Sequence, residues 1–502
     1  AGYHNGPKGF EVFFSHFRTE LGVLKGTAIS NLDDLVAATE REPPQSTADF
    51  SYDIAEPRQE VSHNLLKLNG HIERETGEWR LQYGFQNNNR KEFDIRRGNL
   101  SGIPSIDLQL NTHTIEAEWE STPDQANSFC IGINGMYQDN NNIFGTQRIP
   151  FIPNYNNFSG GVFGVTKLVK AHWVYDFGAR YDYRYYAVTG FDFKNARYSE
   201  TLKFQNVSFT AGATTQLNST QSLAINVSSS WRPPHVAELY SVGTHQSAAA
   251  IEYGLLLNDS TNEVLNINDV SFKIERALKA VSTYRYQKSN LAIELSGYAN
   301  YIFNYIYLKP TGITQNIRGT YPYFRYTQTD ALFLGIDITA DWNLSKQWKL
   351  SPKASLIRAS DERNNDLLVF IPSNRYELAW RFEEPNQLPL KRFFAELKVK
   401  YVARQSRAPR TITARQIKDA SEAGVNLFEN DTRIFDFKDA PADYTLVNGS
   451  IGFSLDRDKT RYDFRLSAEN LFNQSYREYT NRFRYYADDL GRNFMISVKC
   501  IF

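Results

Sequence analysis

Apolar and polar side chains alternate with a period of two along most of this chain. The last nine residues show it clearly, with Phe494, Ile496, Val498, Cys500 and Phe502 on one side. The same alternation recurs at 79–86, 129–134, 223–228, 291–296, 332–339, 396–401, 447–455 and 462–469. A period of two is the pattern of β-strands, so the chain is predicted to be all-β.

The polar side of these predicted strands carries full charges, among them Arg80, Asp337 and Arg465. A β-sandwich needs apolar inner faces that pack into a dry core. A soluble sheet with one face in water shows the same alternation, which keeps that alternative open. A membrane barrel turns its apolar side to lipid and its polar side to an aqueous interior. We therefore predict a transmembrane antiparallel β-barrel.

The connections between predicted strands alternate in length. Short turns are expected at 74–77, 218–220, 288–290 and 456–459, and long polar connections at 19–60, 91–107, 139–158, 232–274, 309–325, 405–441 and 472–492. Long loops are uncommon in compact soluble domains. Short periplasmic turns and long extracellular loops are typical of outer-membrane barrels. About 18 strands are predicted, the first over 9–17 and running upward from the periplasm. A short surface helix is predicted after Ser30 and Asn31.

Composition narrows the class of protein further. Lys plus Arg equals Asp plus Glu at 56 each in 502 residues, so no excess charge favours nucleic acid. The 34 Phe and 30 Tyr suit strands and aromatic girdles at membrane interfaces. No apolar run is long enough for a helical membrane span. Cys130 and Cys500 lie on opposite predicted faces of distant strands, so both are expected to be free thiols.

Three motifs carry a family resemblance. Residues 230–240 read Ser-Trp-Arg-Pro-Pro-His-Val-Ala-Glu-Leu-Tyr, residues 468–473 read Ala-Glu-Asn-Leu-Phe-Asn, and Gly491-Arg492 leads into the strand that ends at Phe502. In this order and spacing they resemble the barrel of a TonB-dependent outer-membrane receptor. The chain is most similar to Bacteroidetes-type receptors of the metal-complex uptake group.

The resemblance implies a 22-stranded barrel in the outer membrane of a Gram-negative bacterium. Residues 1–502 then correspond to strands 5–22, and the N-terminal plug domain and first strands lie outside this sequence. The implied partners are the lipid bilayer, the TonB complex that supplies energy, and a small-molecule metal chelate of the siderophore or haem type. No resident cofactor is implied. We expect no enzyme, because nucleophile-elbow, phosphate-loop and HExxH motifs are absent from the sequence.

The long connection after Pro234 contains candidate metal ligands. His235, Glu238 and His245 combine imidazole and carboxylate groups, which bind metals or metal complexes. The alternative is a set of loop residues without a ligand. Residue 246 is Gln, where the resemblance implies a second histidine.

Aromatic residues in two other connections form a second candidate surface. Tyr321 and Tyr323 belong to one group, and Tyr485 and Tyr486 to another. They are expected either in an interfacial girdle or as a stacking platform for a planar ligand such as a siderophore or haem.

Two other functions remain open from the sequence. One is a passive pore or structural barrel in a surface complex, with a surface lipoprotein as partner. The other is a soluble β-rich binding protein. The cargo is equally open among iron–siderophore, haem, zinc, cobalamin, oligosaccharide and peptide.

Overall fold

A computed structural model describes residues 1–24, 29–44, 51–96, 98–122, 127–245, 250–258, 261, 263–270, 272–316, 319–384, 391–428 and 433–502, with the backbone alone at 245 and 316. Eighteen strands of nine residues or more lie in this part of the chain, which confirms the predicted number. In chain order they are β2 (Lys8–Gly22), β3 (Arg58–Arg74), β4 (Gly77–Phe93), β5 (Ile106–Ser121), β6 (Asn127–Asn142), β7 (Asn154–Lys170), β8 (Trp173–Phe191), β9 (Arg197–Asn218), β10 (Gln221–Arg232), β13 (Glu275–Lys288), β14 (Leu291–Asn316), β15 (Gly319–Asn343), β16 (Trp348–Asp361), β18 (Arg375–Glu384), β19 (Lys391–Val402), β22 (Tyr444–Arg457), β23 (Thr460–Glu469) and β24 (Asn493–Ile501).

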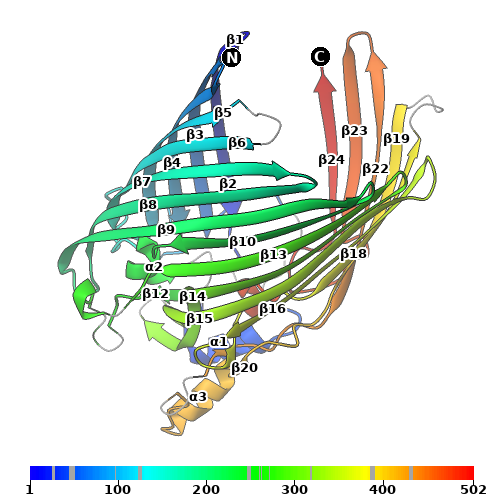
Figure 1. Ribbon diagram of the computed structural model, residues 1–502. Coiled ribbons are helices and arrows are strands. Elements are labelled where there is room, and N and C mark those ends of the chain that lie inside the picture. Colours follow the sequence, from blue (N-terminus) through cyan, green and yellow to red (C-terminus); the bar gives the residue numbers. More distant parts are fainter. Residues whose placement is uncertain are drawn as a thin grey trace.

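These strands follow one another in a single antiparallel sheet that curls around a central space (Figure 1). The short strand β1 (Gly2–Asn5) pairs with β2 at one edge, and β24 pairs with β23 at the other. Figure 1 shows both chain ends at the same end of the molecule. The prediction began the first strand at Gly9 and missed β1, because its four residues are too few to show a period of two.

The two faces of the sheet differ as predicted. Trp79, Leu81 and Val498 point away from the interior with 54%, 53% and 53% of their surface exposed. On the opposite face, Arg80 lies 2.6 Å from both Glu118 and Glu120. The chain therefore turns its apolar side outward, as a barrel in lipid requires.

The short turns lie where the pattern placed them, and one predicted loop is wrong. Residues 309–316 and 319–325 belong instead to β14 and β15, which stay paired with each other beyond the neighbouring strands. The ladder shifts register between Pro310 and Gly312, and such a bulge tolerates a proline that cannot donate a hydrogen bond. Proline alone was therefore a poor signal for the end of these strands.

The long connections carry the helices, all of them short. They are α1 (Leu32–Glu40), α2 (Val236–Tyr240), α3 (Ala414–Glu422) and the 3₁₀ turns η3 (Ile267–Asp269) and η4 (Arg482–Tyr485). The helix α1 begins where predicted, and the Asn31 side chain accepts from the Asp34 backbone N–H at 2.8 Å. None of the helices in the described ranges has the length and apolar character to span a membrane.

Several long connections pack together over one end of the sheet. We call this layer the loop cap: residues 29–44, 250–258, 403–428, 433–443 and 470–492, with the upper part of β15. Its buried core consists of Ile29, Leu35, Val36, Ala38, Ala250, Phe324, Ile412, Ala414, Phe435, Phe437, Tyr485 and Tyr486. Figure 1 shows α1, α3 and β20 (Arg410–Thr411) together at this end, opposite the chain termini.

Candidate functional site

The segment after β10 is built around Arg232. Pro233 and Pro234 end the strand because they have no backbone N–H to offer the ladder. The Arg232 guanidinium donates to both oxygens of Glu238 at 2.7 Å and to Glu275 of β13 at 2.9 Å. Glu238 therefore holds α2 against the strand ends, and an arginine already occupies its carboxylate. Glu238 as a metal ligand stays a prediction.

His235 is the N-cap of α2. Its Nδ1 accepts from the Ala237 backbone N–H at 3.1 Å, and the Glu238 carboxylate accepts from the His235 backbone N–H at 2.7 Å. The two bonds form a capping box, which explains the spacing of the two residues. Because Nδ1 is engaged, Nε2 is the ring nitrogen that remains for a ligand. The ring is exposed and meets Tyr155 edge-on at 5.9 Å.

The other candidate ligand, His245, ends the short strand β11 (Val242–His245), and its side chain lies outside the described residues, as does Gln246. Within the described ranges, no group of three or more His, Cys, Asp or Glu side chains could hold a metal ion. Cys130 and Cys500 are both free thiols, as expected.

The candidate tyrosines mostly pack inside the loop cap. Tyr321 and Tyr485 are each 2% exposed, and Tyr486 is 4% exposed. The Tyr485 hydroxyl donates to Asp436 at 2.6 Å, and burial raises the pKa of this phenol well above its ordinary value. Tyr323 is half-buried, with its ring 5.8 Å from that of Tyr253. Three of the four therefore present no open ring face in this arrangement.

Arg484 and Asp436 form a buried ion pair at the centre of the cap, each with a side chain 1% exposed. Arg484 also donates to the Tyr479 carbonyl at 3.0 Å, and its guanidinium lies 4.7 Å from the Tyr479 ring. Sequence reasoning missed this pair because its members are far apart in the chain and neither lies in a motif.

A polar cavity of about 380 Å³ opens on the inner face of β6–β10, beside Arg232. Arg180 donates to Asp182 at 2.7 Å, and Trp231 Nε1 donates to the same carboxylate at 3.3 Å. Arg184 also lines the cavity, and its guanidinium donates to the Tyr186 hydroxyl at 3.4 Å. Fixed guanidinium donors with one carboxylate suit an anionic or oxygen-rich ligand. Residues from five strands line this cavity, so no local sequence motif could have predicted it.

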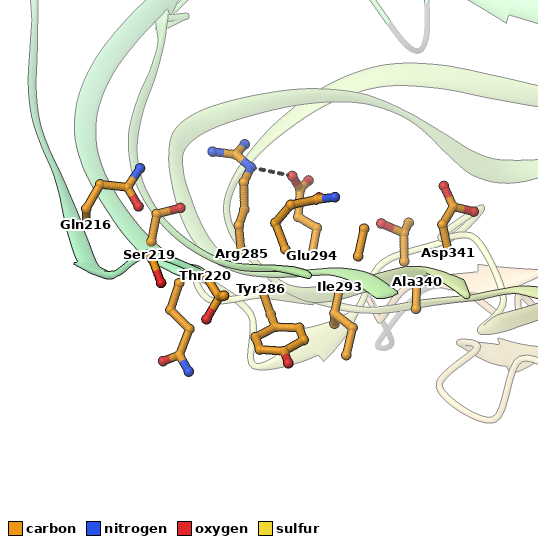
Figure 2. A pocket seen from close by; sticks show the side chains of 14 residues that line it. Gln216, Ser219, Thr220, Arg285, Tyr286, Ile293, Glu294, Ala340 and Asp341 are labelled. Atoms are coloured by element: carbon orange, nitrogen blue, oxygen red, sulfur yellow. Dashed lines mark hydrogen bonds and ion pairs between the residues drawn. The ribbon is translucent and has the colours of Figure 1, made fainter. Parts of the chain in front are cut away.

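A second polar hollow of about 330 Å³ lies at the opposite end, by the short turns. Figure 2 shows Arg285 and Glu294 on one side of the sheet and Tyr286 and Ile293 on the other. The 2.6 Å pair between Arg285 and Glu294 is about half exposed. The lining of this hollow reflects the alternation of side chains between the two faces of the strands. We do not take it as a candidate binding site.

Comparison with known proteins gives the family. The family model described as "TonB dependent receptor-like, beta-barrel" matches residues 11–471. No curated protein matches the sequence. The structure resembles the copper transporter OprC with a TM-score of 0.65 and 16% identity, over 88% of this chain and 64% of that one.

Two further solved structures are similar. The ferric-catecholate import receptor Fiu from K12 E. coli has a TM-score of 0.65 and 12% identity, over 98% of this chain and 72% of that one. The FrpB iron transporter from Neisseria meningitidis has a TM-score of 0.65 and 12% identity, over 100% of this chain and 70% of that one. At such identities the likeness concerns the fold, and the chain spans less than two thirds of OprC.

The sheet faces its apolar side outward, its long loops gather at one end, and a family model covers most of its length. The chain therefore belongs to the TonB-dependent receptor family and is a β-barrel of the Gram-negative outer membrane.

Proposed function

We propose that this barrel belongs to a receptor that captures a metal complex of the siderophore or haem type and imports it with energy from the TonB system. The observation that carries the proposal is a polar interior beneath a loop cap with its own buried core. An open pore needs no such cover. A capture site needs a concave polar surface near the mouth, which the cavity beside Arg232 offers. The similar structures are a copper transporter, a ferric-catecholate import receptor and an iron transporter. Chemistry on the cargo is not part of this function, so we propose no enzymatic activity.

The proposal includes strands and a plug domain outside residues 1–502. In lipid, each unsatisfied backbone group at a sheet edge costs several kcal/mol. The outer edges of β1 and β24 need partners for this reason. The test compares the natural gene product with residues 1–502 alone. The full product is expected to resist unfolding by SDS at room temperature, whereas residues 1–502 alone are expected to unfold. Equal resistance would contradict this part of the proposal.

Uptake is tested in a deletion strain supplied in turn with ferric siderophore, haem or zinc as the limiting nutrient. The wild-type gene is expected to restore growth on one of them, and only in cells with a working TonB system. Restored growth without TonB would favour a passive pore. If no nutrient restores growth and a surface lipoprotein copurifies, the structural-barrel alternative holds instead.

Ligand contact is tested at two positions, His235 and Arg184. His235→Asn keeps an N-cap acceptor and removes the imidazole. Arg184→Gln removes a cavity charge, and Arg285→Gln at the other end of the barrel is its matched control. Binding of the restoring nutrient is expected to weaken about tenfold for Arg184→Gln, a typical loss for one charged hydrogen bond. Unchanged binding in both His235→Asn and Arg184→Gln would place the ligand elsewhere.

A further inference from the structure

The outer face of β2–β6 changes abruptly from apolar to polar along the strands. The last mainly aromatic and apolar row across these five strands is Phe14, Leu66, Phe85, His113 and Tyr137, paired in register. Three apolar rows lie below it, towards the short turns, and they include Trp79 and Leu81. The next row towards the loop cap, which we call the amide row, is His16, Asn64, Asn87, Asn111 and Asp139.

Hydrogen bonds join the amide row from one strand to the next. Asn64 Nδ2 donates to Asn87 Oδ1 at 3.4 Å, and Asn87 Nδ2 donates to Asn111 Oδ1 at 2.8 Å. Asn111 Nδ2 then donates to Asp139 Oδ2 at 3.1 Å. At the other end, His16 Nδ1 lies 2.7 Å from Asn64 Oδ1. Each amide NH₂ has two donors, so these bonds leave one N–H per asparagine for an outside partner.

Two more polar rows continue outward on the same face. The first is Arg18, Ser62, Asn89, Gln109 and Asn141, and the second is Glu20, Glu60, Lys91 and Asp107. From Asn87 to Lys91 the strand rises about 14 Å, or about 11 Å along the membrane normal at the usual strand tilt. An ordinary phospholipid headgroup layer is about 5–8 Å thick. The polar face is therefore taller than a phospholipid headgroup.

The outermost row is fully charged, whereas the amide row and the row directly beyond it consist mainly of neutral hydrogen-bonding groups. The amide row and the row beyond it contain two charged side chains, Arg18 and Asp139, together with the imidazole of His16. Such a surface suits hydroxyl groups better than phosphates, which call for clustered arginine or lysine. The amide row does not continue onto β8, because the residue there that pairs with Asn156 of β7 is Ala187. The amide row is thus bounded on the β8 side.

We propose that the amide row and the row directly beyond it bind the sugar headgroup of an outer-leaflet glycolipid. The acyl chains then lie against the apolar rows below, and sugar hydroxyls bond to the spare amide groups. This binding is independent of the proposed uptake, because it uses the lipid-facing wall. Growth tests with the nutrient therefore fail or succeed separately from it.

The experiment uses the full natural receptor in mild detergent and a fluorescent lipopolysaccharide that carries its core sugars. Asn87→Thr/Asn111→Thr removes two amides and keeps polar, strand-compatible side chains. This double variant is expected to bind the probe about tenfold more weakly, the loss expected for one or two neutral hydrogen bonds. The matched control, Gln82→Thr/Gln86→Thr, changes two inward positions of β4 and is expected to leave the affinity unchanged.

Two competing lipids distinguish sugar from phosphate recognition. Lipid A without core sugars and phosphatidylethanolamine are both expected to displace the probe poorly. Added salt is expected to change the affinity little, since the contacts are uncharged. Equal binding by wild type and the amide-row variant would overturn the proposal. Full displacement by lipid A alone would overturn it as well, because phosphate and acyl chains would then account for the binding.

Discussion

Arg484 shows how single residues hold the loop cap together. Its guanidinium sits beside the Asp436 carboxylate, three backbone carbonyls and two tyrosine rings. Nearly every donor is therefore satisfied, which is the condition under which a buried charge is tolerated. Glu238 plays a similar part for α2, where Arg232 fixes it. Charged residues at these two places thus hold loop segments in position.

Removing one member of the buried pair should loosen the cap strongly. Arg484→Ala leaves the Asp436 carboxylate buried without its partner, and such a break costs about 3–5 kcal/mol. Limited proteolysis of the folded receptor is expected to cut the 433–443 or 470–492 segment much faster. The control Arg415→Ala removes an exposed pair with Glu40 and should leave cleavage unchanged. Equal cleavage of both variants would contradict the anchoring role.

At the scale of elements, each strand is fitted to its neighbours by register and side-chain size. Gly452 of β22 faces Phe394 of β19, whose ring lies 4.0 Å from the Arg381 guanidinium. A Cβ on Gly452 would stand 2.4 Å from that ring and 2.8 Å from the Phe464 carbonyl oxygen. The glycine is therefore required by the close approach of an aromatic ring and a neighbouring backbone.

Gly452→Ala should destabilise the barrel by about 1–3 kcal/mol, because the ring and the backbone have to move apart. The urea midpoint of the receptor folded in lipid vesicles measures this. Gly297→Ala is the matched control, since a Cβ at Gly297 meets no atom within 4 Å. A similar fall in both midpoints would show that backbone flexibility, and not packing, decides the result.

The two faces of one strand should respond differently to charge. Ile336 of β15 is 45% exposed on the outer face, and Thr339 lies on the inner face. Ile336→Lys should cost about 2–4 kcal/mol near mid-bilayer, while Thr339→Lys should cost little because the inner face is wet. Vesicle unfolding midpoints compare the two. A larger loss for Thr339→Lys would reverse the assignment of the faces.

At the scale of the whole molecule, segments far apart in the chain meet in the loop cap. Arg415 of α3 pairs with Glu40 of α1 at 2.8 Å, and Lys418 pairs with Asp33 at 2.5 Å. Arg482 pairs with Glu252 at 2.8 Å, which ties the last loop to the connection after β10. The cap is thus a set of loops joined by a buried core, by the largely buried Arg482–Glu252 pair, and by an ionic rim of partly exposed pairs between α1 and α3.

The ionic rim should make the cap sensitive to charge and salt. Arg415→Glu places a like charge beside Glu40, so protease cleavage in 29–44 is expected to become faster. The double variant Glu40→Arg/Arg415→Glu should restore the wild-type rate, and high salt should reduce the difference by screening. Fast cleavage in the double variant would show that the pair does not hold α1 and α3 together.

The sequence by itself determined the strands, their number and the direction of their apolar side. Each of these follows from neighbours in the chain, as in the alternation of Trp79 with Arg80 or of Ile336 with Asp337. The capping residue Asn31 and the end of β10 at Pro233 were readable for the same reason. Family membership was also readable, from the motif after Ser230 and the terminal Phe502.

Only the tertiary structure decided where the candidate site residues lie and what they contact. Tyr485 and Tyr486 looked like surface aromatics and are core residues of the cap, because segments hundreds of positions away cover them. Arg184 joins a cavity and Asn87 joins a five-strand row through pairings that the sequence does not specify locally. Burial and cross-strand partners depend on which strands become neighbours, and that is settled when the whole sheet assembles.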